Sequence, residues 1–109
     1  MYDNIPVNQR PDYLDHLNKV KECESYLVGK LGFKRTSHNW CSYEFNSVFE
    51  QDNLEVRIVY ETSLPSSIML IDNDLPYDES KGLTNVEFIS NFHRNSFETV
   101  KGKIEMKRK

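Results

Sequence analysis

An alternation of apolar and polar residues between positions 40 and 61 is the feature that most constrains this fold. Successive side chains of a strand point to opposite faces of its sheet, so period-two hydrophobicity predicts strands with one buried face. We expect strands over residues 40–50 and 54–61, joined by the polar connection Gln51-Asp52-Asn53 into an antiparallel hairpin. The buried face is predicted to carry Cys41, Tyr43, Phe45, Phe49, Leu54, Val56, Ile58 and Tyr60, and the opposite, accessible face Glu44, Glu55 and Arg57.

The residues before this hairpin have the spacing of a helix. Apolar residues recur every three or four positions, which predicts an amphipathic helix over residues 12–31 with Asp12 as its cap. Gly32 is expected to end it in a left-handed conformation, and residues 33–36 to form a short strand. Residues 67–72 are apolar on both faces, which predicts a further strand that is central or covered.

Thr84 and Glu87 have the spacing of a helix capping box, which predicts a second helix from residue 85 to about residue 95. Continuation of this helix to Lys101 and a further strand through Ile104 and Met106 are both compatible with the pattern. The predicted fold is α+β, with an N-terminal helix, a three- to four-stranded antiparallel meander and a C-terminal helix on one face. Residues 1–109 are expected to form one domain, with an extended lead-in over 1–11 and a basic tail over 102–109.

Charge is distributed unevenly along the chain. The net charge is -3, but residues 101–109 hold five of the fourteen Lys and Arg, which leaves -7 for residues 1–100. An acidic body repels phosphate, so we expect no nucleic acid to bind through it. No apolar run approaches the roughly 18 residues of a membrane span, so no membrane association is expected. The two cysteines and the absence of a leader pattern at Met1 predict a cytoplasmic location.

Few motifs indicate chemistry. His38 and Cys41 are spaced for a metal site or a Cys-His nucleophile, but no second ligand pair and no orienting group accompany them. Cys41 is therefore expected to be a buried, inert thiol, and Trp40 to lie at the edge of the core. The four glycines lack the spacing of a nucleotide-binding loop. We predict no catalytic residue, no metal and no cofactor.

The acidic stretch over residues 72–83 is the main candidate for binding. It superficially resembles a calcium loop, but Pro76 replaces the central glycine and Leu83 the closing glutamate. Its carboxylates are instead expected to steer a basic protein partner, with an aromatic ring as anchor. The predicted partner-binding residues are Asp72, Asp74, Tyr77, Asp78 and Glu79 from this stretch, together with Glu44 and Glu55.

The order of these elements resembles that of small acidic immunity proteins of bacterial toxins and of phage-encoded inhibitors. The segments that carry the resemblance are Leu31-Gly32-Phe33, Tyr43-Glu44-Phe45, Val56-Arg57-Ile58 and Phe88-Ile89 with Phe92, within residues 14–97. The resemblance implies a non-enzymatic protein-binding inhibitor that covers a basic cleft of its partner. Two alternatives remain open: a small enzyme that uses His38 and Cys41, and a homodimer or larger homo-oligomer paired through an open sheet edge.

Overall fold

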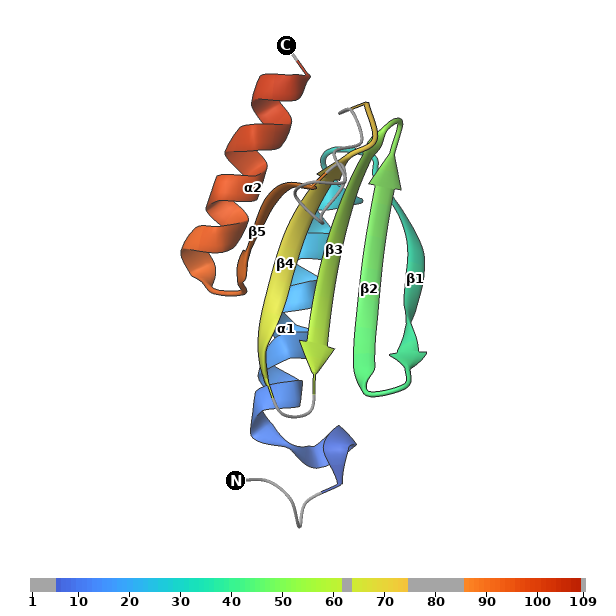
Figure 1. The fold of residues 1–109 in the computed structure, drawn as a ribbon, viewed down its shortest axis with the longest axis vertical. Coiled ribbons are helices and arrows are strands. Elements are labelled where there is room, and N and C mark those ends of the chain that lie inside the picture. The colour runs from blue at the N-terminus through green and yellow to red at the C-terminus, as the bar shows by residue number, and fades with distance from the viewer. Residues whose placement is uncertain (1–5, 62–63, 75–85, 109) are drawn as a thin grey trace, which may run out of the picture.

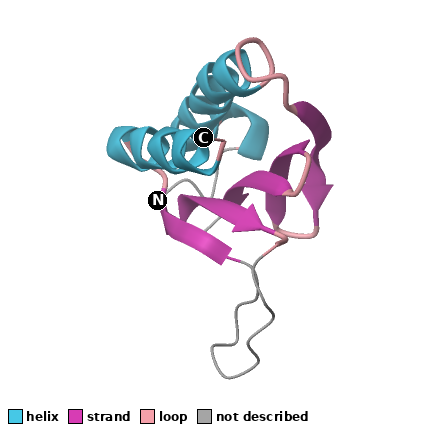
Figure 2. Cartoon of the chain, turned by 90° about the horizontal axis from the view of Figure 1, so that it is seen from above, coloured by secondary structure: helices cyan, strands magenta, loops and turns pink. Residues whose placement is uncertain are grey.

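The chain folds into one five-stranded antiparallel sheet (Figure 1) with two α-helices on the same face (Figure 2). The computed structural model describes residues 6–61, 64–74 and 86–108. The elements in chain order are a 3-10 helix (Val7–Gln9), α1 (Pro11–Leu27), β1 (Lys34–Cys41), β2 (Glu44–Gln51), β3 (Leu54–Glu61), β4 (Leu64–Asp72), β5 (Val86–Asn91) and α2 (Arg94–Lys107). The sheet order follows the chain, β1-β2-β3-β4-β5. The predicted α+β fold is confirmed, with one strand more than expected.

Two-residue turns connect the first three strands. Both turns place their first central residue in the left-handed region, Ser42 at φ 59 and Asp52 at φ 54, as tight hairpins require. The predicted hairpin of β2 and β3 is confirmed, but the single strand expected over 40–50 is wrong, because Ser42 and Tyr43 turn the chain. Cys41 consequently ends β1 and is exposed, and Tyr43 is 76% exposed, so neither belongs to the predicted buried face.

Helix α1 begins with Pro11, a residue suited to this position because its missing amide would have no partner there. Arg10 occupies the cap position, so the capping role predicted for Asp12 is wrong. The Asp12 carboxylate instead accepts a hydrogen bond from the Tyr60 hydroxyl, at 2.9 Å. The helix ends at Leu27, earlier than predicted, and Gly32 adopts the expected left-handed conformation with φ 83.

The prediction for residues 85–95 is wrong where the structure describes them. Val86–Asn91 forms strand β5 on the outer side of β4, and α2 starts at Arg94. The capping box lies nine residues later than expected, where the Ser96 hydroxyl accepts a hydrogen bond from the backbone N–H of His93. Helix α2 continues to Lys107, so most of the predicted basic tail is helical and carries the fully buried Ile104.

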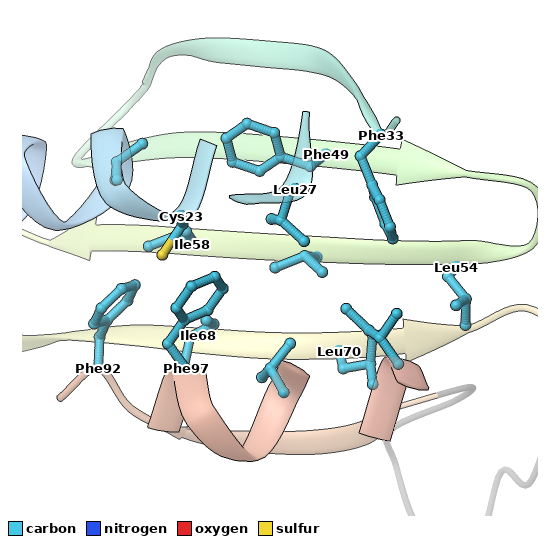
Figure 3. Packing of buried hydrophobic residues seen from close by; sticks show 14 residues of the cluster. Cys23, Leu27, Phe33, Phe49, Leu54, Ile58, Ile68, Leu70, Phe92 and Phe97 are labelled. Carbon is cyan, nitrogen blue, oxygen red and sulfur yellow. The ribbon is translucent and has the colours of Figure 1, made fainter. Parts of the chain in front are cut away.

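The core lies between the two helices and the face of the sheet that they cover, as Figure 2 shows. One large cluster joins α1, the middle strands and α2 (Figure 3); its members include Val20, Cys23, Leu27, Phe49, Val56, Ile58, Ile68, Leu70, Phe97, Val100 and Ile104. Burial raises the pKa of the Cys23 thiol to about 12, so this cysteine is an inert core residue.

A second cluster fills the other end of the same face. It consists of Tyr13, Phe45 and Tyr60, whose rings pack edge to face. Trp40, at the end of edge strand β1, packs against Tyr13 and Phe45 with ring centroids 5.6 and 5.4 Å apart and is 40% exposed. No described helix combines the length and the apolar character that a membrane crossing needs.

Candidate functional site

The face of the sheet turned away from the helices is the candidate site, because no described helix or strand covers it (Figure 2). Cross-strand pairing arranges its residues in rows. One row runs Lys34-Glu50-Glu55-Ile71 and the next Ser37-Val48-Arg57-Met69-Ile89. The third runs Asn39-Asn46-Val59-Ser67-Asn91, and the last contains Cys41, Glu44 and Glu61. We call this the open face.

Two pairs of glutamates lie directly opposite each other on the open face. Glu50 of β2 is in register with Glu55 of β3, and Glu44 of β2 with Glu61 of β3. Like charges in directly opposed positions destabilise an antiparallel sheet. At about 3.3 Å per residue, the six positions from Glu44 to Glu50 separate the two pairs by roughly 20 Å. Acidic pairs that oppose folding therefore lie at both ends of the open face.

Glu55 is the most enclosed of these carboxylates, with an exposed fraction of 8%. Its Oε2 lies 2.9 Å from Nη2 of Arg57, two positions along the same strand. Burial raises the pKa of Glu55 and the facing Glu50 raises it further, while Arg57 opposes both effects. A negative charge at Glu55 is thus only partly compensated by its neighbours.

A groove of about 570 Å³ runs over the β1–β3 half of the open face. Its lining includes Glu44, Glu50, Glu55 and Arg57, with Asn39 and Asn46 between the two acidic pairs. The structure therefore joins Glu44 and Glu55, both predicted from sequence, in one depression. Glu55 is much less exposed than the predicted accessible face implied, because Glu50, Arg57 and Ile71 surround it.

The β4–β5 half of the open face carries apolar residues instead of acidic pairs, with Ser67 and Asn91 beyond them. Met69 and Ile71 of β4 are partly exposed, and Ile89 of β5 is 49% exposed opposite Met69. An acidic groove therefore borders an exposed apolar patch on a continuous surface. Such a mixture of apolar and charged areas is typical of protein–protein interfaces.

Asp72 and Asp74, also predicted to bind a partner, lie at the end of β4 near Asn53 and Lys107 and do not belong to the open face. The Asp72 carboxylate accepts hydrogen bonds from Lys107 Nζ at 2.6 Å and from the backbone N–H of Asp74 at 2.9 Å. Lys107, aided by the Asp74 amide, lowers the pKa of Asp72, and the carboxylates of Asp72 and Glu87 raise the pKa of Lys107. Asp74 accepts a hydrogen bond from the Asn53 amide. Tyr77, Asp78 and Glu79 lie outside the described residues.

His38 and Cys41 occupy opposite faces of β1. The ring of His38 packs on Phe45, with centroids 4.9 Å apart, and its Nδ1 is 3.0 Å from the Ser47 hydroxyl. Cys41 is paired with Glu44 on the open face. A strand cannot bring side chains three positions apart together, because odd spacing puts them on different sides. This geometry does not support the nucleophilic pair or shared metal site that their spacing suggested.

Within the described residues, no group of three or more His, Cys, Asp and Glu side chains is arranged to hold a metal ion. A second groove, of about 540 Å³, separates α1 from α2 and has Cys23, Phe92 and Phe97 among its lining residues. Side chains of both charges surround it, including Asp15, Lys19, Glu98 and Lys101. This mixture offers no preference for a ligand of either charge.

Glu50 and Glu61 were not among the residues predicted to bind. The alternation of residues 40–61 already places Glu50 on the face of Glu44, and Glu61 on the face of Glu55. The strand register, which depends on the turn at Asp52 and Asn53, makes them opposing pairs.

Comparison of the chain with protein-family models, curated proteins and solved structures finds no match in any of the three.

Proposed function

We propose that this protein is a non-enzymatic binding factor, of the inhibitor or immunity-protein type, that covers a basic surface of a partner protein with its open face. The observation that carries the proposal is that glutamates face each other twice across β2 and β3, as Glu44–Glu61 and as Glu50–Glu55. Their mutual repulsion opposes folding, and a basic partner would relieve it.

The apolar half of the open face supports a protein as the partner. Met69 and Ile89 offer area that a protein surface can cover, while the acidic groove beside them gives attraction at long range. The expected association is fast and weakened by salt, because the charges steer the encounter. An inhibitor of this kind acts by occupying the partner's basic surface, so it requires no chemistry of its own.

Pairing of two copies through edge strand β1 is less well supported. Edge strand β1 begins with Lys34 and Arg35, and its register with β2 shifts between Arg35 and Ser37. Charged residues and bulges on an edge strand both discourage strand pairing with another chain. Light scattering of the full chain over a range of concentrations tests this alternative, which requires a dimer that persists on dilution.

The proposal is tested by affinity capture from the native host with the full chain and three matched variants. Glu44→Lys and Ile89→Glu alter the acidic and apolar halves of the open face, and Glu105→Lys alters an exposed position on α2. We expect one protein to be retained by the wild-type chain and by Glu105→Lys, and to be lost with both open-face variants and in 0.5 M salt.

The captured protein is then purified and its own activity is measured with and without this chain. Inhibition would be supported if the wild-type chain abolishes the partner's activity at a one-to-one ratio and the Glu44→Lys variant does not. Retention of the partner by both open-face variants would show that this surface is not the binding site, and the proposed function would then be wrong.

A further inference from the structure

The environment of Glu55 at the floor of the open-face groove indicates which group of the partner it receives. Glu55 Oε2 is buried and lies 2.9 Å from Nη2 of Arg57, an ion pair whose geometry falls short of a well-directed hydrogen bond. Arg57 Nε is also buried without a hydrogen-bond partner. The two side chains thus make a close charge contact without the paired hydrogen bonds that a guanidinium and a carboxylate form when they are aligned.

Glu50 supplies a second carboxyl group beside this one. It is exposed and lies directly across from Glu55 on the neighbouring strand. Opposed residues of an antiparallel pair have their Cβ atoms about 5 Å apart, so the two carboxyl groups lie next to each other on the open face. Two cations border these acids: Arg57, the guanidinium among the described residues that line the groove, and the exposed Lys34 of β1, which lies opposite Glu50.

Resting on the proposed function, we propose that Glu50 and Glu55 together bind the guanidinium group of an arginine from the partner protein, and that Arg57 gives up its contact with Glu55 when this occurs. A guanidinium has five donors in a planar fork, which matches two adjacent carboxylates, whereas a lysine ammonium is a compact point charge. Val48 and Ile71, the apolar neighbours of Glu50 and Glu55 on this face, flank the site and suit the weakly hydrated faces of the guanidinium plane.

The test uses the full chain, labelled with ¹⁵N, and three capped tripeptides as probes. The peptides are Gly-Arg-Gly, Gly-Lys-Gly and Gly-citrulline-Gly, where citrulline has the shape of arginine without its charge. We expect the arginine peptide to shift the amide resonances of β2 and β3 around Glu50 and Glu55 saturably. Its dissociation constant should be at least threefold lower than that of the lysine peptide, and the citrulline peptide should cause no saturable change.

Matched variants locate the binding. Glu50→Gln and Glu55→Gln each remove one negative charge and should weaken binding of the arginine peptide at least threefold. Glu105→Gln removes the same charge from an exposed position on α2 and should leave binding unchanged. If Glu55→Gln fails to fold, Glu50→Gln still tests the inference, because Glu50 is exposed.

Several results would overturn the inference: shifts that do not saturate, equal affinities for the arginine and lysine peptides, or equal losses in Glu50→Gln and Glu105→Gln. Such a result leaves the proposed function standing if capture of the partner still depends on Glu44 and Ile89. Conversely, if the arginine peptide binds specifically while Glu44→Lys and Ile89→Glu still capture the partner, the arginine site is upheld and the proposed function is refuted.

Discussion

His16 shows how burial sets the chemistry of a single side chain in this fold. The imidazole lies between α1 and the sheet with an exposed fraction of 1%, and its Nδ1 is 3.0 Å from the Ser66 hydroxyl. Its Nε2 has no hydrogen-bond partner, and the ring packs near Tyr60 and Phe92. Burial, aided by Lys19 and opposed by Asp15, lowers the pKa of His16 from 6.5 to about 4.

This shift makes stability depend on pH in a defined window. Between pH 6.5 and about 4 the unfolded chain binds a proton at His16 and the folded chain does not, so stability falls as the pH falls. The loss amounts to at most about 3 kcal/mol and is complete near pH 4. Urea unfolding at a series of pH values measures it, and an NMR titration of the imidazole checks its origin. An imidazole that titrates near pH 6.5 would contradict this account.

Asp72 belongs to the residues predicted to bind a partner, yet its contacts are those of a structural group. We expect Asp72→Asn to lower the free energy of unfolding by about 1–2 kcal/mol, because Lys107 and the Asp74 amide lose a charged acceptor. The matched control is Asp52→Asn, in the neighbouring turn at φ 54, where asparagine is at least as favourable. Equal urea midpoints for both variants would disprove the structural role.

The acid sensitivity of Asp72 falls in another pH range than that of His16. Because the folded-state pKa of Asp72 is lowered, its stabilising effect is present above its unfolded pKa of about 3.9 and is lost only below that value. The Asp72→Asn variant should therefore lose stability between pH 6.5 and 4 just as the wild-type chain does.

At the scale of elements, α2 decides whether the C-terminal residues are part of the core. Ile104 is fully buried, whereas Met106 on the same helix is 75% exposed. We expect Ile104→Ala to cost about 2–5 kcal/mol through lost apolar contact and a residual cavity. Met106→Ala should change stability by less than about 0.5 kcal/mol. Similar losses for the two variants in urea unfolding would mean that the end of α2 does not pack as described.

The elements also show where sequence patterns succeed. The hairpin of β2 and β3 was predictable because Asp52-Asn53 supplies turn chemistry between two alternating runs. The turn at Ser42-Tyr43 was not, because neither residue is typical of a left-handed position and the apolar Tyr43 continued the alternation. Cys41 and Tyr43 were therefore assigned to a buried face that they do not share.

Strand β5 was mistaken for a helix because its sequence carries the helical pattern more strongly than the strand pattern. Thr84 and Glu87 have capping-box spacing, and Val86, Ile89 and Phe92 fit a helical period. Only Val86-Glu87-Phe88 alternates, yet pairing with β4 makes a strand that packs Phe88 against the core and leaves Ile89 exposed. Pairing with β4 makes this segment a strand and not a helix, and the local sequence does not contain the information on that pairing.

At the scale of the whole molecule, the two faces of the sheet differ in composition: one is apolar and buried, and the other carries the acidic pairs. The helix-covered face holds the buried apolar clusters, and the open face holds Glu44, Glu50, Glu55 and Glu61. From sequence, Glu44 and Glu55 could be placed on the open face, but which carboxylates oppose each other depends on register. We expect these glutamates to lower the stability of the fold and to strengthen binding of a basic partner.

Glu44→Lys tests that conflict, because it converts the opposed pair with Glu61 into a pair of opposite charges. We expect its urea midpoint to rise, by the equivalent of about 0.2–1 kcal/mol, while capture of the partner is lost. Glu105→Lys makes the same charge change on α2, away from the open face, and should alter the midpoint little and leave capture intact. A lower midpoint for Glu44→Lys would show that repulsion within the pair does not oppose folding, and the open face would lose its main argument for a basic partner.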